Sequence, residues 1–156
     1  MTALYFEDFE VGATFTTGGR TVTESDVMTF AGLSGDLNPL HVDREFSKRV
    51  GFDTPVAHGL LVLSIASGLG IQTGIFTGTN LALLGLEDWR FVAPVRFGDT
   101  VRMHSTVLET RVSSKPDRGV VRIGQEIKNQ RDETVQTGVF VSLMKTRGAD
   151  RDGGQT

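Results

Sequence analysis

Several residue types that mark particular protein classes are missing or scarce in this sequence. The 156 residues include no cysteine, which excludes a disulfide scaffold, a thiolate nucleophile and thiolate metal sites, and fits a reducing compartment. Lysine and arginine number 16 against 19 aspartates and glutamates, and no basic run exceeds two residues. The net charge of −3 lacks the positive excess that nucleic acid phosphates attract. We therefore expect no nucleic-acid partner.

Long hydrophobic runs and signal-peptide features are also lacking. The longest apolar tract, GLLVLSIASGLGI, is interrupted by glycine and serine and is too short to cross a bilayer. The first residues, MTALYFEDFEVG, are acidic and have no basic segment followed by an apolar one, as a signal peptide would. We therefore expect a cytoplasmic protein without a membrane partner.

The length and the composition indicate one domain, residues 1–146, followed by a short polar tail. A domain of this size can bury a full core without disulfides or metals. The tail, 147–156, has the sequence RGADRDGGQT, and its few apolar side chains cannot offset the entropy cost of ordering it. We predict that this tail is disordered.

Helical periodicity is confined to the first half of the domain. A helix capped by Thr23 or Ser25 is expected to end at Gly35, and a second, shorter helix is expected to begin at Asp43. Residues 58–69 are apolar on almost every side, which is typical of a helix buried at the centre of a core.

After Thr79 apolar and polar residues alternate, as they do in strands with one buried face. Such alternation is typical of antiparallel sheets, so we predict an α+β fold in which a mainly antiparallel sheet wraps around the apolar helix. The turn NQRDE between the last two segments favours a hairpin, and an early strand or hairpin is expected at 14–23. The four later strands are predicted at 81–95, 99–112, 119–130 and 133–145.

The stretch GDLNPLHVD, residues 35–43, holds an acid and an imidazole at a fixed offset. Asp36 and His41 are five positions apart, and Pro39 forces Asn38 out of the helical region. Because Asn38 can also hydrogen-bond its own backbone, we predict a rigid, non-helical connector. Rigidity favours catalysis by a positioned acid and base, although a helix cap and a structural histidine would give the same pattern.

The segment DTPVAHGLL provides a second candidate at the start of the apolar helix. A helix N-terminus has free N–H groups, and the missing side chain of Gly59 would let a carbonyl oxygen reach them, although Gly59 could equally serve close packing. Ser67 lies two turns along the helix, where it could line a pocket or bond its own backbone. His58 is expected to be a neutral ring that orients a loop, since a helix N-terminus disfavours a cation.

Together these residues carry a resemblance to a known family. Residues 30–68, FAGLSGDLNPLHVDREFSKRVGFDTPVAHGLLVLSIASG, resemble the hydratase signature of the MaoC-like dehydratases, the (R)-specific enoyl-CoA hydratases. The later WRFVAPVRFGDTV resembles the strand-loop-strand that follows in the same family, and the resemblance covers roughly 6–145. It implies the hot-dog fold, an antiparallel sheet wrapped around one long central helix, usually with two subunits that join their sheets.

The resemblance also implies an activity and roles for particular residues. Asp36 and His41 match the catalytic pair, Gly59 matches the backbone N–H that polarises the thioester carbonyl, Ser67 matches a pocket serine, and Asn38 matches a position that shapes the loop. The implied reaction is reversible addition of water to a trans-2-enoyl-CoA, in which coenzyme A is part of the substrate and no cofactor is needed. A homodimer or a dimer-based higher oligomer is expected, with 121–130 as a sheet edge that pairs with a second subunit.

Other functions stay open. A hot-dog acyl-CoA thioesterase shares the fold and the thioester substrates, and a non-catalytic subunit of a heteromeric dehydratase would share the sequence pattern. Metal binding is disfavoured because one carboxylate and one imidazole leave a site short of ligands, and neither His58 nor His104 has a spacing that completes it. The length, branching and carboxylation of the acyl group also stay open.

Overall fold

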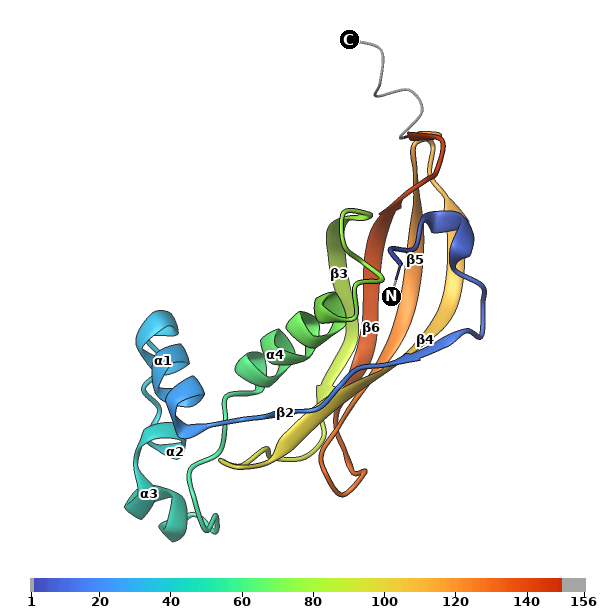
Figure 1. Cartoon of the computed structure of the whole chain (residues 1–156). Coiled ribbons are helices and arrows are strands. Elements are labelled where there is room, and N and C mark those ends of the chain that lie inside the picture. The colour runs from blue at the N-terminus through green and yellow to red at the C-terminus, as the bar shows by residue number, and fades with distance from the viewer. Residues whose placement is uncertain (1, 150–156) are drawn as a thin grey trace.

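The computed structural model describes residues 2–149, and an antiparallel sheet that curves around one helix forms its body (Figure 1). The sheet order is β1-β4-β5-β6-β3, and β2 pairs with β4. This arrangement confirms the predicted α+β fold and the four long strands. The strands are β1 (Thr14–Thr16), β2 (Arg20–Thr21), β3 (Asn80–Phe91), β4 (Thr100–Val112), β5 (Arg118–Lys128) and β6 (Thr134–Lys145).

The strand order corrects the expectation about the sheet edge. β5 lies between β4 and β6 and pairs with both along its length, so segment 121–130 belongs to a central strand. β3 pairs with β6 alone among the described residues, and its other side is therefore an open edge of the sheet. The prediction was wrong because alternation reports that a strand is half-buried, which is true of central and edge strands alike.

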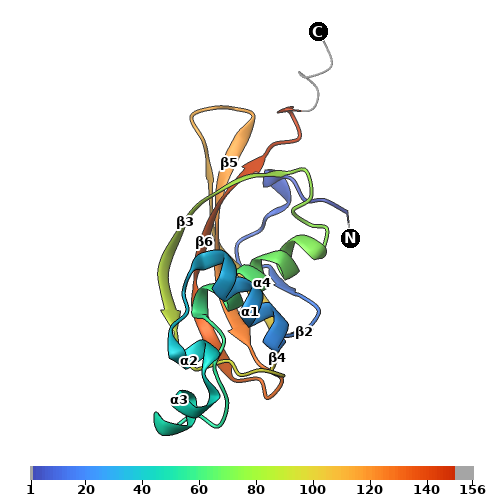
Figure 2. The same ribbon diagram turned by 90° about the vertical axis from the view of Figure 1, so that its left-hand side faces the viewer.

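The helix α4 (Gly59–Gln72) packs on the concave face of the sheet (Figures 1 and 2). It continues beyond the predicted end at Leu69, and Gly70 fits closely under Met103, where a Cβ would lie 2.9 Å from the methionine Cε. Leu60 and Ile71 are 60% and 48% exposed, so one side of the helix faces outward in the single chain. The helix is central, as predicted, but it is not buried all round.

Three short helices project beyond the sheet at the N-terminal end of α4 (Figures 1 and 2). The first begins at Thr23, whose hydroxyl accepts from the N–H of Asp26, and ends at Gly35, which has a φ of 75°. The third begins at Asp43, whose carboxylate accepts from two backbone N–H groups. Both caps were predicted. The helices are α1 (Glu24–Ser34), α2 (Pro39–Val42) and α3 (Arg44–Arg49).

The short helix α2 replaces the predicted non-helical connector. Asn38 keeps the extended conformation that a following proline imposes, with φ −53° and ψ 129°. Pro39 then starts the helix at its first position, where its fixed φ is suitable and its missing N–H is no loss. As a result His41 lies on a helical turn, and the rigidity of the segment comes from this helix and its cap.

The N-terminal segment contacts the described part of the C-terminal tail. It contains a short 3-10 helix, η1 (Phe6–Asp8). The backbone N–H of Arg147 donates to Glu7, and its guanidinium pairs with Asp8 and lies over the ring of Tyr5. The rest of the tail that was predicted to be disordered, 150–156, lies outside the described residues. Within 2–149 no helix is both long and apolar enough to span a bilayer.

Candidate active site

Asp36, His41 and His58 come together where the projecting helices meet the start of α4. One potential ligand atom from each residue lies within 4.8 Å of the other two. The rings of His41 and His58 stack, with centroids 3.8 Å apart and 30° between their planes. The sequence paired Asp36 with His41, but the stacked second imidazole was not predicted, and the segment AHG was the only signal for it.

The hydrogen bond that His41 makes leaves one ring nitrogen free for proton transfer. Nδ1 lies 2.7 Å from the carbonyl oxygen of Val56. A carbonyl oxygen can only accept, so we assign the proton to Nδ1 and, in the neutral ring, the lone pair to Nε2. His41 is half-buried. It can therefore take or give a proton at Nε2 while its other nitrogen fixes the ring.

The carboxylate of Asp36 is accessible, and its side chain is 53% exposed. Its Oδ1 accepts from the N–H of Asn38 at 3.2 Å, and the Oδ1 of Asn38 accepts from the N–H of Leu40 at 3.0 Å. These two hydrogen bonds, each from a side chain to the backbone two residues further on, connect the carboxylate to the start of α2. Asn38 thus occupies the position from which it would shape the loop, as the resemblance implies.

His58 holds the backbone at Asp36. The side chain is 3% exposed, and its Nε2 donates to the carbonyl oxygen of Asp36 at 2.9 Å and lies 3.9 Å from Oδ2 of the same residue. Phe30 packs on the ring, with centroids 5.0 Å apart. The Nδ1 atom is buried without a partner, so a second proton there would have no acceptor. This geometry agrees with the expected ring that orients a loop.

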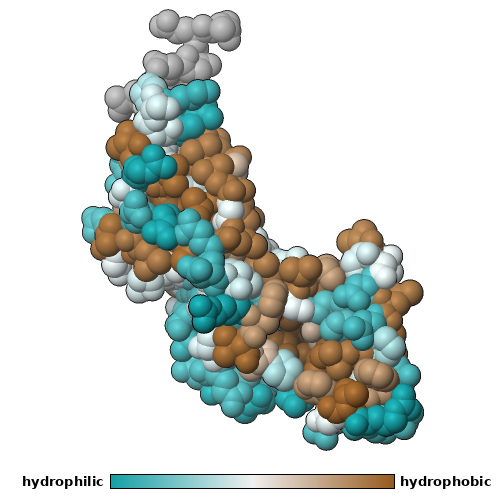
Figure 3. Space-filling view, turned by 180° about the vertical axis from the view of Figure 1, so that it is seen from behind, coloured by the Kyte–Doolittle hydropathy of each residue, from teal (hydrophilic) through white to brown (hydrophobic). Residues whose placement is uncertain are grey.

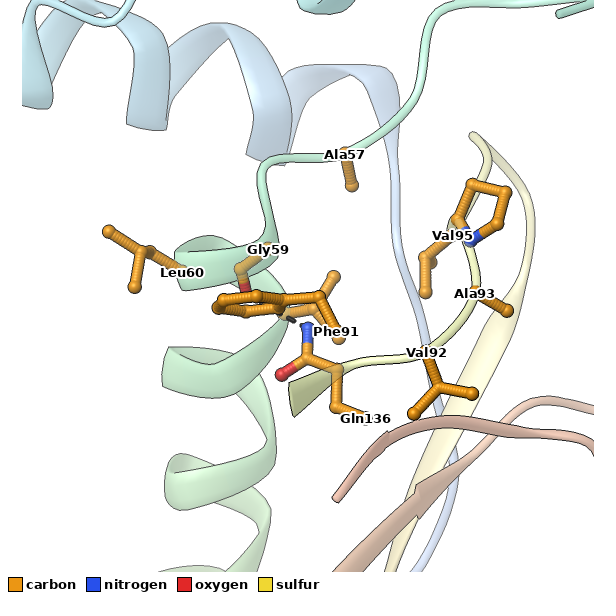
Figure 4. Close-up of a pocket in the computed structure, with 10 residues that line it drawn as sticks. Ala57, Gly59, Leu60, Phe91, Val92, Ala93, Val95 and Gln136 are labelled. Carbon is orange, nitrogen blue, oxygen red and sulfur yellow. Dashed lines mark hydrogen bonds between the residues drawn. The ribbon is translucent and has the colours of Figure 1, made fainter. Parts of the chain in front are cut away.

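Gly59 is the first residue of α4, and its N–H has no acceptor among residues 2–149. The ring of Phe91 lies against its bare Cα, where a Cβ would fall 2.6 Å from ring carbons (Figure 4). The Nε2 of Gln136 donates to the carbonyl oxygen of Gly59 at 2.9 Å, and Trp89 Nε1 donates to Gln136 Oε1 at 3.1 Å. Gly59 therefore does serve close packing, and its N–H still points to no protein acceptor.

A cavity of about 360 Å³ opens at this end of α4, between the helix and the segment that follows β3 (Figure 4). Most of its wall is apolar, which suits the acyl or pantetheine part of a thioester better than a charged group. The lining residues are Ala57, Gly59, Leu60, Val62, Phe91, Val92, Ala93, Pro94, Val95 and Gln136.

Ser67 is not part of this group of residues. It lies two turns along α4, about 12 Å from Gly59 along the helix axis. There it lines a separate, smaller cavity between α4 and the sheet. Within one chain the structure brings Asp36, His41 and the start of α4 together and leaves Ser67 apart from them.

The cluster of Asp36 and the two histidines also corrects the reason given against a metal site, because His58 does supply a third potential ligand. Its Nε2 already donates to the Asp36 carbonyl, as Nδ1 of His41 does to Val56. Each ring therefore has only one nitrogen left that could bind a metal ion. The absence of a metal stays a prediction.

The comparisons with known proteins agree with this geometry. Residues 8–131 match the family model described as MaoC like domain. The chain belongs to the MaoC-like domain family. The (R)-specific enoyl-CoA hydratase of Rhodospirillum rubrum is 38% identical over 107 residues, which are 66% of this chain and 69% of that protein. Protein MaoC of Klebsiella aerogenes is 37% identical over 102 residues, 65% of this chain but 30% of its own length.

Solved structures show the same fold. The (R)-hydratase of Aeromonas caviae, described as involved in PHA biosynthesis, superposes with a TM-score of 0.70 at 31% identity over 87% of this MaoC-like chain and 97% of its own. A protein of Mycobacterium tuberculosis described as having a double hot-dog fold gives a TM-score of 0.82 at 23% identity, over 92% of this chain and 44% of its own. The predicted hot-dog fold is confirmed.

Proposed function

We propose that this MaoC-like protein adds water reversibly to the double bond of a trans-2-enoyl-CoA thioester. One observation carries the proposal: the carboxylate of Asp36 and the free Nε2 of His41 lie together beside the unpaired N–H at the start of α4. Hydration of an enoyl thioester needs an acid, a base and a donor for the thioester oxygen. The name of the Rhodospirillum rubrum relative supports this reaction.

The acid and the base act at adjacent carbon atoms. One of the two groups takes a proton from a water molecule as that water attacks C3, and the other gives a proton to C2. Each transfer by a positioned side chain contributes a factor of about 10²–10⁴ to the rate. The exposed face of Asp36 admits the water, and the bond from His41 to Val56 keeps the imidazole in place.

The N-terminus of α4 stabilises the charge that develops between these steps. As water adds, negative charge moves onto the thioester oxygen, and a helix N-terminus presents free N–H groups and a partial positive charge to it. Loss of a comparable donor costs about 3 kcal/mol of transition-state stabilisation. The proposed reaction uses no cofactor, because coenzyme A enters as part of the substrate.

We further infer that two copies of the chain pair through the open edge of β3. An unpaired edge with exposed apolar side chains is a ready surface for a second strand. The projecting helices extend beyond their own sheet, and apolar surface lies both on them and on the body (Figure 3). The exposed leucines of β3 are Leu81, Leu83, Leu84 and Leu86.

A single assay separates the proposed hydratase from the two other candidates. The purified chain is mixed with crotonyl-CoA, and both the enoyl-thioester absorbance and the free thiol are followed. We expect the absorbance to fall without release of thiol. Release of thiol would identify a thioesterase. Neither change, with crotonyl-CoA or with longer, branched or carboxylated enoyl-CoA thioesters, would identify a non-catalytic subunit.

A further inference from the structure

A deeper cavity lies between the C-terminal half of α4 and the concave face of the sheet. Its volume is about 40 Å³, room for about two water-sized groups. Part of its wall is formed by Phe76, Met103 and Ile123, which belong to the apolar core. Of the other lining residues, Gly70, Ile71, Leu83 and Phe140 add no polar side chain, and four residues are polar. The polar residues are Ser67, Asn80, Gln125 and Ser142.

The polar groups around this cavity have hydrogen-bonding capacity that the protein itself does not use. Ser142 and Gln125 are 3% and 2% exposed. The Oε1 of Gln125 accepts from Ser105 Oγ at 2.6 Å, and its amide nitrogen has no acceptor in the described chain. The hydroxyls of Ser67 and Ser142 likewise have no partner within 2–149, and Asn80 Oδ1 is buried without one. Ser67 is only half-buried, but buried polar groups are normally paired, so the unused groups of Gln125, Ser142 and Asn80 indicate a ligand group.

A hollow lies beside this cavity along α4. Leu60, Leu63 and Ser67 follow one another at three- and four-residue spacing and therefore share one helix face. A groove of about 330 Å³ runs beside Leu63 and Ser67, and Ser67 and Phe140 line both this groove and the deeper cavity. From Gly59 to Ser67 the helix rises about 12 Å, which an extended chain spans in about ten bonds.

We propose that the acyl group of the substrate ends in an uncharged hydrogen-bonding group, such as a terminal hydroxyl, which binds among Ser67, Asn80, Gln125 and Ser142. This inference rests on the proposed function, since it takes the thioester carbonyl to lie at Gly59. The acyl chain then follows the hollow along α4, and its last atoms enter the polar cavity.

The side chains that line the cavity favour a hydroxyl at the end of the acyl chain over an alkyl or a carboxylate end. A plain alkyl end would leave the polar groups unpaired, and a site built to bond a hydroxyl discriminates strongly against an analogue that lacks one. A carboxylate end would be buried without a cation, because no lysine, arginine or histidine lines the cavity. Arg90 lines a groove on the opposite face of the sheet.

The test measures binding, so that it does not depend on turnover. Three saturated thioesters, decanoyl-CoA, its terminally hydroxylated analogue and its terminally carboxylated analogue, are titrated calorimetrically into the full-length protein. We expect the hydroxylated thioester to bind at least about tenfold more tightly than the other two. Ser142→Ala and Ser67→Ala each remove one hydroxyl and should bring the hydroxyl-to-alkyl ratio of affinities toward one.

Thr106→Ala is the matched control, because Thr106 follows Ser105 on β4 and points to the opposite face of the sheet. It should keep the full preference for the hydroxylated thioester. Equal or tighter binding of decanoyl-CoA by the wild type would overturn the inference and assign the cavity to ordered water. Tightest binding of the carboxylated thioester, or no binding of any of the three, would overturn it as well. Turnover of crotonyl-CoA, measured separately, tests the proposed function.

Discussion

Two histidines that stack on each other have different hydrogen-bonding partners and therefore different roles. Nδ1 of His41 donates a hydrogen bond to the carbonyl oxygen of Val56 and Nε2 stays free, so His41 can exchange protons with a substrate at Nε2. His58 is buried, and its Nε2 donates a hydrogen bond to the backbone carbonyl oxygen of Asp36. We therefore propose that His41 and Asp36 transfer protons and that His58 positions the Asp36 loop.

The positioning role of His58 predicts the behaviour of two substitutions. His58→Phe keeps an aromatic ring against His41 and Phe30 but loses the donor to Asp36, and we expect kcat for crotonyl-CoA to fall about 10- to 100-fold. His58→Gln retains an N–H donor and should recover part of the loss. KM should change little in both variants. An unchanged kcat in His58→Phe would show that this bond does not hold the carboxylate in place.

Acid-base chemistry without a metal makes a second prediction for the same cluster. Prolonged treatment with EDTA, followed by desalting, should leave the rate of crotonyl-CoA hydration unchanged. Added Zn²⁺ should not raise the rate, because the proposed proton transfers by Asp36 and His41 need no metal ion. Loss of activity on chelation with recovery on adding a metal would assign Asp36, His41 and His58 to a metal centre.

Site residues could be found from the sequence where they lie close together along the chain. Asp36, Asn38 and His41 lie within six positions, and the motif that joins them is visible in one chain segment. The stack of His58 on His41 joins residues 17 positions apart, and the ring of Phe91 on Gly59 joins residues 32 apart. Such contacts depend on how distant segments pack, which no local pattern records.

The helix caps were predictable because each is a local exchange of hydrogen bonds. Thr23 and Asp26 cap each other's backbone at the start of α1, as their spacing suggests. The helix α2 and the central position of β5 were missed for two different reasons. A single turn after proline is too short to show a period, and the order of strands in a sheet is decided by tertiary packing.

The cap of α1 predicts a pH-dependent stability. Burial alone would raise the pKa of the Asp26 carboxyl, but hydrogen bonds from the backbone and hydroxyl of Thr23, together with Arg20, lower it below its usual value. A lowered pKa in the folded state means that the charged carboxylate stabilises the fold above the unfolded pKa of about 4. This contribution is lost as the pH falls through the folded pKa.

Asp26→Asn should therefore be less stable than the wild type at neutral pH, by about 1 kcal/mol in the free energy of unfolding. The difference should shrink as the pH falls below about 4. Urea unfolding followed by circular dichroism at neutral and acid pH measures both values. A difference that stays constant across this range would contradict the assigned role of the charged cap.

The open edge of β3 predicts how the chain assembles. Light scattering should give the mass of a dimer for the wild type and of a monomer for Leu84→Glu, because a carboxylate at the edge would be buried without a partner. Leu108→Glu is the control, since Leu108 is 45% exposed, comparable with 54% for Leu84, but lies over Gly124 from β4, which β5 and β6 separate from the β3 edge. A monomeric wild type would contradict pairing through β3.

The fold and the family were predictable because their signals extend over most of the chain. The apolar helix and the alternating strands gave the layer arrangement, and the signature in 30–68 matched the family that the comparisons confirm. The sheet edge available to a second copy of the chain was not predictable, since it depends on the order of the strands in the sheet. The cytoplasmic location and the boundary at residue 146 stay predictions.

The measurement that tests the proposed hydration most directly is kcat for crotonyl-CoA in Asp36→Asn and His41→Gln. Both substitutions keep the local hydrogen bonds possible, so the melting temperature should stay close to that of the wild type. We expect kcat to fall about 10²–10⁴-fold in each. Asp53→Asn and His104→Gln, which change an acid and a histidine outside the cluster, should retain the wild-type rate. Retention of that rate in either Asp36→Asn or His41→Gln would contradict the catalytic pair.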